Sequence, residues 1–215
     1  MTKRMKDNLI KILLVVIAVF YALFLLIDFL QLNAIKLSNH VKFLTIVLIF
    51  FISILLLDKD ESKPSLNLQA NFILASFLTI ITDYLLLFTH RYKLGIGVFL
   101  IVHYLRLRGA FPKVKKKILI SSLIVFIIGL IFTNFFVALV LVYAFLLINN
   151  LNLAYLNNNH KKNNLFIAYI LFVLCDLSVM LNYLGVLKPF STAAIWLFYL
   201  PSQVLLAYEI KRNEL

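Results

Sequence analysis

Residues 81–109 read ITDYLLLFTHRYKLGIGVFLIVHYLRLRG, and this stretch decides the fold of the chain. Two apolar runs flank a short basic turn, and each run carries one polar residue that a lipid-facing helix does not need. These residues are Asp83 in the first run and His103 in the second. An ionised aspartate inside hydrocarbon costs about 2.5–3.5 kcal/mol on membrane-insertion scales. Such a residue therefore indicates a functional site that faces the protein interior or a wet cavity.

The composition around this hairpin is that of an integral membrane protein. Of the 215 residues, 63% are hydrophobic and only 14% are charged, and the mean hydropathy is +1.00. A soluble domain typically has about 25% charged residues. The apolar runs are about 20 residues long, which suits helices because a helix satisfies its own backbone hydrogen bonds inside lipid. The short alternating segments of a membrane barrel do not occur in this sequence.

Eight such runs predict an all-α polytopic membrane protein with eight transmembrane helices, in a single integral membrane domain over residues 1–215. The first run is too long for a secretory signal and lacks a small-residue cleavage site, so we expect it to be retained as a span. The predicted spans are residues 9–32, 41–57, 66–88, 92–107, 118–133, 135–156, 165–184 and 190–210.

The formal charge of +12 predicts an orientation and not nucleic-acid binding, because the basic residues lie between the spans. With the N-terminus inside, the inner segments carry sixteen lysines and arginines and the outer segments carry five. This asymmetry favours a multi-pass protein of the cell membrane with both termini in the cytoplasm. The most basic inner segment is residues 106–117, which we interpret as a loop.

Several charged or polar residues within the spans allow a more specific interpretation. We interpret Asp28 as an exposed interfacial carboxylate and Lys42 as a snorkelling anchor at the start of its span. Asp83 is the last of several polar residues that helical spacing puts on one face of the third span. Asp176 lies near the middle of the seventh span. One hairpin runs from Asp83 to His103 and a later one from Asp176 to Gln203. We hypothesise a four-plus-four internal repeat, whose site would lie at the repeat interface.

Two carboxylates that meet in a low-dielectric pocket cannot both ionise cheaply, so one is expected to hold a proton while the other is charged. Such a pair can protonate a substrate on one side and activate water on the other, as in glycosidases. His103 and Gln203 are candidates to orient the carboxyls or the water. A set of aromatic side chains suits an apolar tail or the flank of a developing cation: Phe99, Tyr143, Tyr169, Tyr183, Trp196 and Tyr199.

Three functions stay open on these residues: a polar network that only holds helices together, a proton-coupled transporter or flippase of a small lipid, and an enzyme. Absent motifs narrow the enzyme classes, since there is no G-x-S-x-G elbow, no H-E-x-x-H and no Cys/His cluster. The single cysteine excludes a disulfide framework. Residues 157–164, NNNHKKNN, are interpreted as a linker, because one histidine among lysines is a poor set of metal ligands.

The ordered motifs resemble the YhhN-type lysoplasmalogenase family of eight-helix membrane proteins. The similar stretches are ITDYLLL (81–87), GIGVFLIVHYL (95–105), FVLCDLSVMLN (172–182) and FYLPSQVLLAYE (198–209). Thr82 and Cys175 depart from the small residues usual before each aspartate. The positions that match the family's motifs are Lys42, Asp83, His103, Tyr143, Asp176, Tyr199 and Gln203.

The resemblance implies hydrolysis of the vinyl ether of a lysoplasmalogen to a fatty aldehyde and a glycerophospho-alcohol. It implies Asp83 and Asp176 as the catalytic pair, one as acid and the other to activate water. The expected partners are a lysophospholipid substrate and the lipid bilayer, and no metal or organic cofactor is required. The resemblance further implies a set of residues that bind or orient the substrate: Lys42, His103, Tyr143, Tyr199 and Gln203.

Overall fold

Helices joined by short connections make up the computed structural model, which describes residues 2–30, 35–57, 66–111, 115–156, 164–188 and 190–212. These ranges contain eight helices and no strand, which confirms the all-α prediction. Each helix coincides with one predicted span, and the largest differences are at α1 and α2, which begin six residues early. The helices are α1 (Lys3–Phe29), α2 (Ile35–Leu55), α3 (Leu66–Leu87), α4 (Tyr92–Ala110), α5 (Lys115–Phe132), α6 (Phe135–Leu156), α7 (Asn164–Tyr183) and α8 (Phe190–Arg212).

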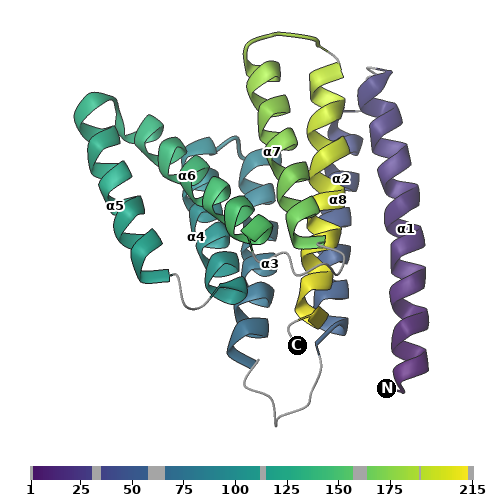
Figure 1. Cartoon of the computed structure of the whole chain (residues 1–215). Helices are drawn as coiled ribbons and strands as arrows, with labels where there is room; N and C mark the ends of the chain where they lie inside the picture. Colours follow the sequence, from purple (N-terminus) through teal and green to yellow (C-terminus); the bar gives the residue numbers. More distant parts are fainter. Residues whose placement is uncertain are drawn as a thin grey trace.

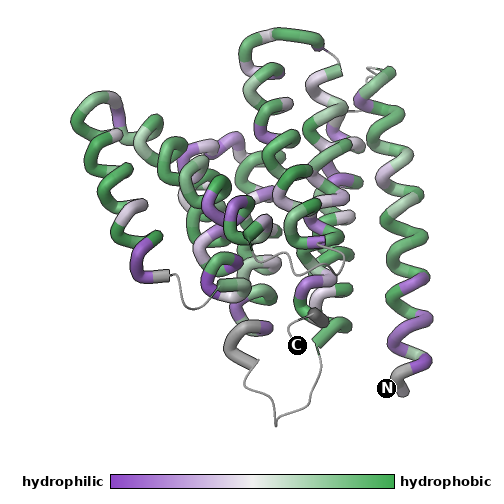
Figure 2. Tube along the Cα trace, viewed as in Figure 1, coloured by the Kyte–Doolittle hydropathy of each residue, from purple (hydrophilic) through white to green (hydrophobic). Residues whose placement is uncertain are grey.

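The helices have the length and the outward chemistry of a multi-pass membrane protein. Six of those described, α1, α2, α3, α6, α7 and α8, are long and apolar enough to cross a membrane. The other two carry more charge: α5 begins with Lys115, Lys116 and Lys117, and α4 contains Lys93 and two arginines. Hydrophobic residues dominate the helices along the trace (Figure 2), and many of their large apolar side chains are exposed at the surface. Lipid accepts such a surface, whereas water would penalise it.

The arrangement places two hairpins at the centre of the bundle. The closest helix pairs are α3 with α4 and α7 with α8, and α8 also contacts α3. The helix α1 lies at one edge against α2 and α8, and the α5–α6 hairpin lies at the opposite edge (Figure 1). The start of α1 and the end of α8 lie toward the same end of the bundle (Figure 1). These two helix ends therefore share one side, and which compartment that side faces stays a prediction.

Many polar side chains in the spans are satisfied within their own helix. The hydroxyl of Thr82 donates to the carbonyl oxygen of Leu78 at 2.9 Å, and that of Ser178 donates to the carbonyl of Leu174 at 2.8 Å. This bond to the preceding turn hides a hydroxyl from lipid without a partner on another helix. These residues therefore need no functional explanation, in contrast to the buried charged groups described below.

Some predicted connections lie outside the described residues. They are the polar turn at 58–65, residues 157–163 of the predicted linker, and residues 112–114 of the basic segment.

Candidate functional site

Asp83 lies in the interior of the bundle, near the end of α3. Only 3% of the residue is exposed. The hydroxyl of Tyr199, on α8, lies 2.9 Å from one carboxylate oxygen and 2.8 Å from the other, and donates its hydrogen between them. Tyr199 is itself buried. A hydrogen bond to a charged group is stronger than one between neutral groups, so this phenol offsets part of the cost of burying the carboxylate.

Asp176 has an equivalent partner. The hydroxyl of Tyr143, on α6, donates to Asp176 Oδ2 at 2.8 Å. Asp176 is half-buried on α7, whereas Asp83 is fully enclosed. Each aspartate of the two hairpins is thus held by a phenol from another helix.

Phe99, on α4, connects the two carboxylate–phenol pairs. Its ring centroid lies 6.2 Å from that of Tyr143 and 6.4 Å from that of Tyr199. Phe172, on α7, packs edge-on against it at 6.0 Å. Because both phenols contact one ring, both carboxylates border a single aromatic cluster. The cluster consists of Phe99, His103, Tyr143, Phe172, Trp196 and Tyr199.

Two of the six aromatics predicted for the substrate tail, Tyr169 and Tyr183, are not members of this cluster. Tyr183 is 89% exposed at the end of α7, although helical spacing puts it on the face of Asp176. The prediction for Tyr183 is wrong because α7 extends beyond the packed part of the bundle at that end. Tyr169, at the other end of the same face, is fully buried as expected.

His103 packs within the aromatic cluster without contacting either carboxylate. Its ring centroid lies 5.1 Å from that of Tyr143 and 5.0 Å from that of Phe172. Neither ring nitrogen has a hydrogen-bond partner among the described residues. Its carbonyl oxygen accepts from Asn150 Nδ2 at 3.2 Å, which ties α4 to α6. His103 was predicted to orient the carboxyls or the water, but its ring hydrogen-bonds to neither carboxyl in this structure.

Arg106 is the buried residue that sequence reasoning missed. We interpreted it as part of a basic loop, but α4 continues to Ala110 and leaves Arg106 only 1% exposed. Its Nη2 donates to Gln203 Oε1 at 2.7 Å and, with weaker geometry, to Thr79 Oγ1 at 3.4 Å. The signal that could have found it is its spacing, since residues three apart share a helix face and His103 is three residues earlier. Gln203 is accordingly the partner of this guanidinium.

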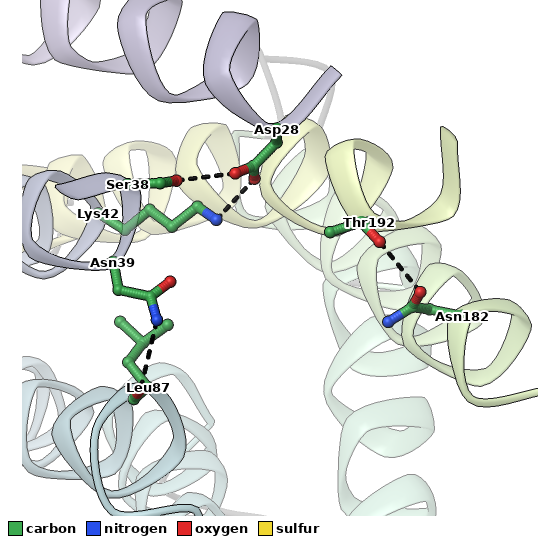
Figure 3. A network of polar contacts seen from close by, with 7 residues as sticks. All are labelled: Asp28, Ser38, Asn39, Lys42, Leu87, Asn182 and Thr192. Carbon is green, nitrogen blue, oxygen red and sulfur yellow. Dashed lines mark hydrogen bonds and ion pairs between the residues drawn. The ribbon is translucent and has the colours of Figure 1, made fainter. Parts of the chain in front are cut away.

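Asp28 and Lys42 form a buried ion pair between α1 and α2 (Figure 3). Lys42 Nζ lies 2.6 Å from Asp28 Oδ2, and the two side chains are only 5% and 8% exposed. Ser38 Oγ donates to the other carboxylate oxygen at 2.7 Å. Both interfacial interpretations were wrong, because two charges that neutralise each other can be buried where one alone could not.

Lys42 is connected to Asp83 through aromatic rings. Its ammonium lies 5.2 Å from the ring centroid of Trp196, a cation–π distance, and Trp196 packs edge-on against Tyr199 at 5.2 Å. Tyr199 in turn holds Asp83. A role for Lys42 in the site is therefore one of positioning, through Trp196.

A model of the YhhN family matches residues 37–210. This range covers most of the chain and contains both hairpins and every candidate site residue. The chain belongs to the YhhN family. This membership confirms the resemblance seen in the sequence, and α1, with Asp28, precedes the matched range. No curated protein and no solved structure matches this YhhN-family chain.

Proposed function

We propose that this YhhN-family protein hydrolyses the vinyl ether of a lysoplasmalogen, with Asp83 and Asp176 as the acid/base pair. The observation that carries the proposal is the pair of carboxylates on α3 and α7, whose phenol partners both pack against Phe99 inside a membrane bundle. Family membership agrees with it. A lipid vinyl ether suits this site, because its tail is apolar and the reaction needs only a proton donor, a proton acceptor and water.

The surroundings of the two carboxyls suggest different roles. Asp83 receives the Tyr199 hydroxyl between its two oxygens and lies within electrostatic reach of Arg106. Both carboxyls accept a phenol hydrogen bond, so Arg106 is the group that distinguishes them. A nearby cation favours the ionised form against the opposing effect of burial, and Asp83 is therefore assigned as the general base. Tyr143 donates to Asp176 at Oδ2, which leaves Oδ1 to carry a proton. Asp176 is assigned as the general acid.

The reaction adds one water in three steps. The carboxyl of Asp176 gives its proton to the outer vinylic carbon, and the carbon that bears the ether oxygen becomes an oxocarbenium ion. Water attacks this carbon while Asp83 accepts a proton from it, which gives a hemiacetal. The hemiacetal hydroxyl then returns a proton to Asp176, Asp83 protonates the departing glycerol oxygen, and the aldehyde leaves. Both carboxyls finish in their starting states.

The aromatic cluster has two tasks in this mechanism. Phe99, Phe172 and Trp196 give the alkenyl chain an apolar wall, so that the vinyl group can lie between the carboxyls. Their rings also favour a positive charge that develops beside them, because the face of an aromatic ring is electron-rich.

The decisive experiment is aldehyde release from a purified lysoplasmalogen by the protein in lipid nanodiscs. Asp83→Asn and Asp176→Asn should each abolish release while size-exclusion profile and thermal stability stay near those of the wild type. Asp7→Asn, at an exposed position on α1, is the control and should retain full activity. Full activity in either site variant would overturn the paired-acid mechanism. If a pH gradient drives lipid uptake and no aldehyde is formed, the protein is a transporter. If both site variants lose stability, the two aspartates have a structural role.

A further inference from the structure

A second layer of polar side chains lies one helical turn from the carboxylates. Thr79 precedes Asp83 by four residues on α3, and Gln203 follows Tyr199 by four residues on α8. Four residues of helix correspond to roughly 6 Å along the axis. Arg106 bonds to both Thr79 and Gln203, so it lies in this second layer. The carboxylates and the guanidinium therefore occupy adjacent levels of the same bundle interior.

Several polar atoms around Arg106 and His103 are buried and have no hydrogen-bond partner in the part of the chain that the structure describes. They are Arg106 Nη1, both ring nitrogens of His103, the Tyr169 hydroxyl, Gln203 Nε2 and Asn150 Oδ1. A buried polar atom without a partner costs about 1–3 kcal/mol, and more when it is charged. A native bundle rarely tolerates so many in one place, so a group outside the protein is expected to satisfy them.

These atoms belong to one cluster, here called the Arg106 cluster: His103, Arg106, Asn150, Tyr169 and Gln203. Gln203 bonds directly to Arg106, and Asn150 bonds to the backbone of His103. Tyr169 and His103 both lie within electrostatic reach of the guanidinium. Its unsatisfied groups are mainly hydrogen-bond donors, since guanidinium, amide nitrogen and phenol all donate and an imidazole donates through at least one nitrogen.

We propose that the Arg106 cluster binds the phosphate of the lipid headgroup. This inference rests on the proposed function, because it assigns the second half of the same substrate. A phosphodiester is an acceptor-only anion, and a guanidinium with a free nitrogen binds it with charge-assisted bonds of matched geometry. In a lysoplasmalogen one glycerol unit separates the phosphate from the vinyl ether. That span is comparable with the single helical turn between the two layers.

A purely structural role accounts less well for Arg106. As a counter-ion for Asp83 it would be expected to bond to that carboxylate, yet its Nη2 donates to Gln203 and Thr79, which are both neutral. Its Nη1 stays unpaired among the described residues. A fully buried cation whose bonds go to neutral acceptors keeps most of its charge available for an anionic ligand.

The test is a binding measurement, so it does not depend on catalysis. The probes are an alkyl-ether lysophosphatidylethanolamine, which has no vinyl group to cleave, the alkylglycerol of the same chain, and inorganic phosphate. Wild-type protein should bind the phosphorylated lipid about tenfold or more tightly than the alkylglycerol. Arg106→Gln should lose this preference. Arg108→Gln, on the same helix but exposed, is the matched control and should keep it.

Other outcomes would overturn the proposal. If the wild type shows no preference for the phosphorylated lipid, or if Arg106→Gln keeps the preference, the phosphate does not bind at this cluster. If inorganic phosphate binds as tightly as the lipid and displaces it fully, the ligand is free phosphate and the headgroup assignment is wrong.

A second variant tests the proposal even if Arg106→Gln does not fold. Gln203→Glu keeps an acceptor for the guanidinium, so the bundle should remain folded, but it replaces the amide donor with a negative charge. It should also lose the preference for the phosphorylated lipid, and an unchanged preference would contradict the proposal. Failure of vinyl-ether hydrolysis would leave these affinities unaffected, so the two proposals fail separately.

Discussion

The hydroxyl of Tyr199 donates between the two carboxylate oxygens of Asp83, at 2.9 and 2.8 Å, although 116 residues separate them in the sequence. The bond joins α3 to α8 in the interior of the bundle. It therefore positions Asp83, the aspartate of the α3–α4 hairpin, from the last helix, and the two hairpins form one site only when α8 is packed in place.

Removal of this hydroxyl tests its contribution. Tyr199→Phe should lower kcat for aldehyde release by about 10- to 100-fold, because a hydrogen bond to a charged group contributes about 1.5–3 kcal/mol. The control is Tyr183→Phe, since Tyr183 is 89% exposed and should not affect turnover. Unchanged kcat in Tyr199→Phe would show that Asp83 does not depend on this phenol.

The proposed proton transfer to carbon predicts an isotope label. In D₂O the fatty aldehyde should carry one deuterium on the carbon next to the carbonyl, because Asp176 delivers a solvent-derived proton there. Mass spectrometry of the aldehyde, trapped at once as an oxime, would detect it. The same aldehyde incubated in D₂O with inactive Asp83→Asn protein controls for exchange after release. An unlabelled product would rule out protonation at carbon.

The mechanism also predicts a bell-shaped dependence of kcat/KM on pH. Activity should rise with pH as Asp83 becomes ionised and should fall again as Asp176 loses its proton, because each carboxyl works in one state only. The pKa values read from the rising and falling sides of this profile belong to the pair of carboxyls and not to either residue alone, since coupled groups titrate together. Initial rates of aldehyde release across pH would check this, and a single sigmoid would mean that only one titrating group is required.

The ion pair between Asp28 and Lys42 predicts strongly non-additive stability. Lys42→Met should destabilise the protein by about 3–5 kcal/mol, because it leaves Asp28 buried without its counter-ion. The double variant with Asp28→Leu should recover much of that loss. Denaturant unfolding in detergent would measure both. Lys36→Met, at an exposed position of the same helix, is the control, and additive effects in the double variant would contradict the prediction.

Two glycines should respond to alanine in opposite ways. A Cβ added at Gly129 would lie 3.0 Å from Ala138 Cα, so α5 and α6 would have to separate. At Gly97 the described residues leave open space, and alanine favours the helix by about 1 kcal/mol. Thermal stability should therefore fall in Gly129→Ala and stay equal or rise in Gly97→Ala. Equal shifts in both would mean that the α5–α6 contact adapts freely.

The sequence could not predict which phenol bonds to which carboxyl. Tyr143 and Tyr199 were predicted as orienting residues, but their spacing does not say which aspartate each one holds. That choice depends on which helices are neighbours: α6 lies beside α7, and α8 beside α3. Helix adjacency in a bundle comes from packing of whole surfaces, which no local pattern records.

The sequence by itself determined the spans and the two intramembrane aspartates. Lipid penalises charge and unsatisfied backbone so strongly that an apolar run predicts a helix and an isolated aspartate stands out. Arg106 and Asp28 could not be recognised in this way, because each lies near the end of a span, where water or headgroups would also accept a charge. Only the tertiary structure decided that both are buried, since burial at a helix end depends on which other helices cover it.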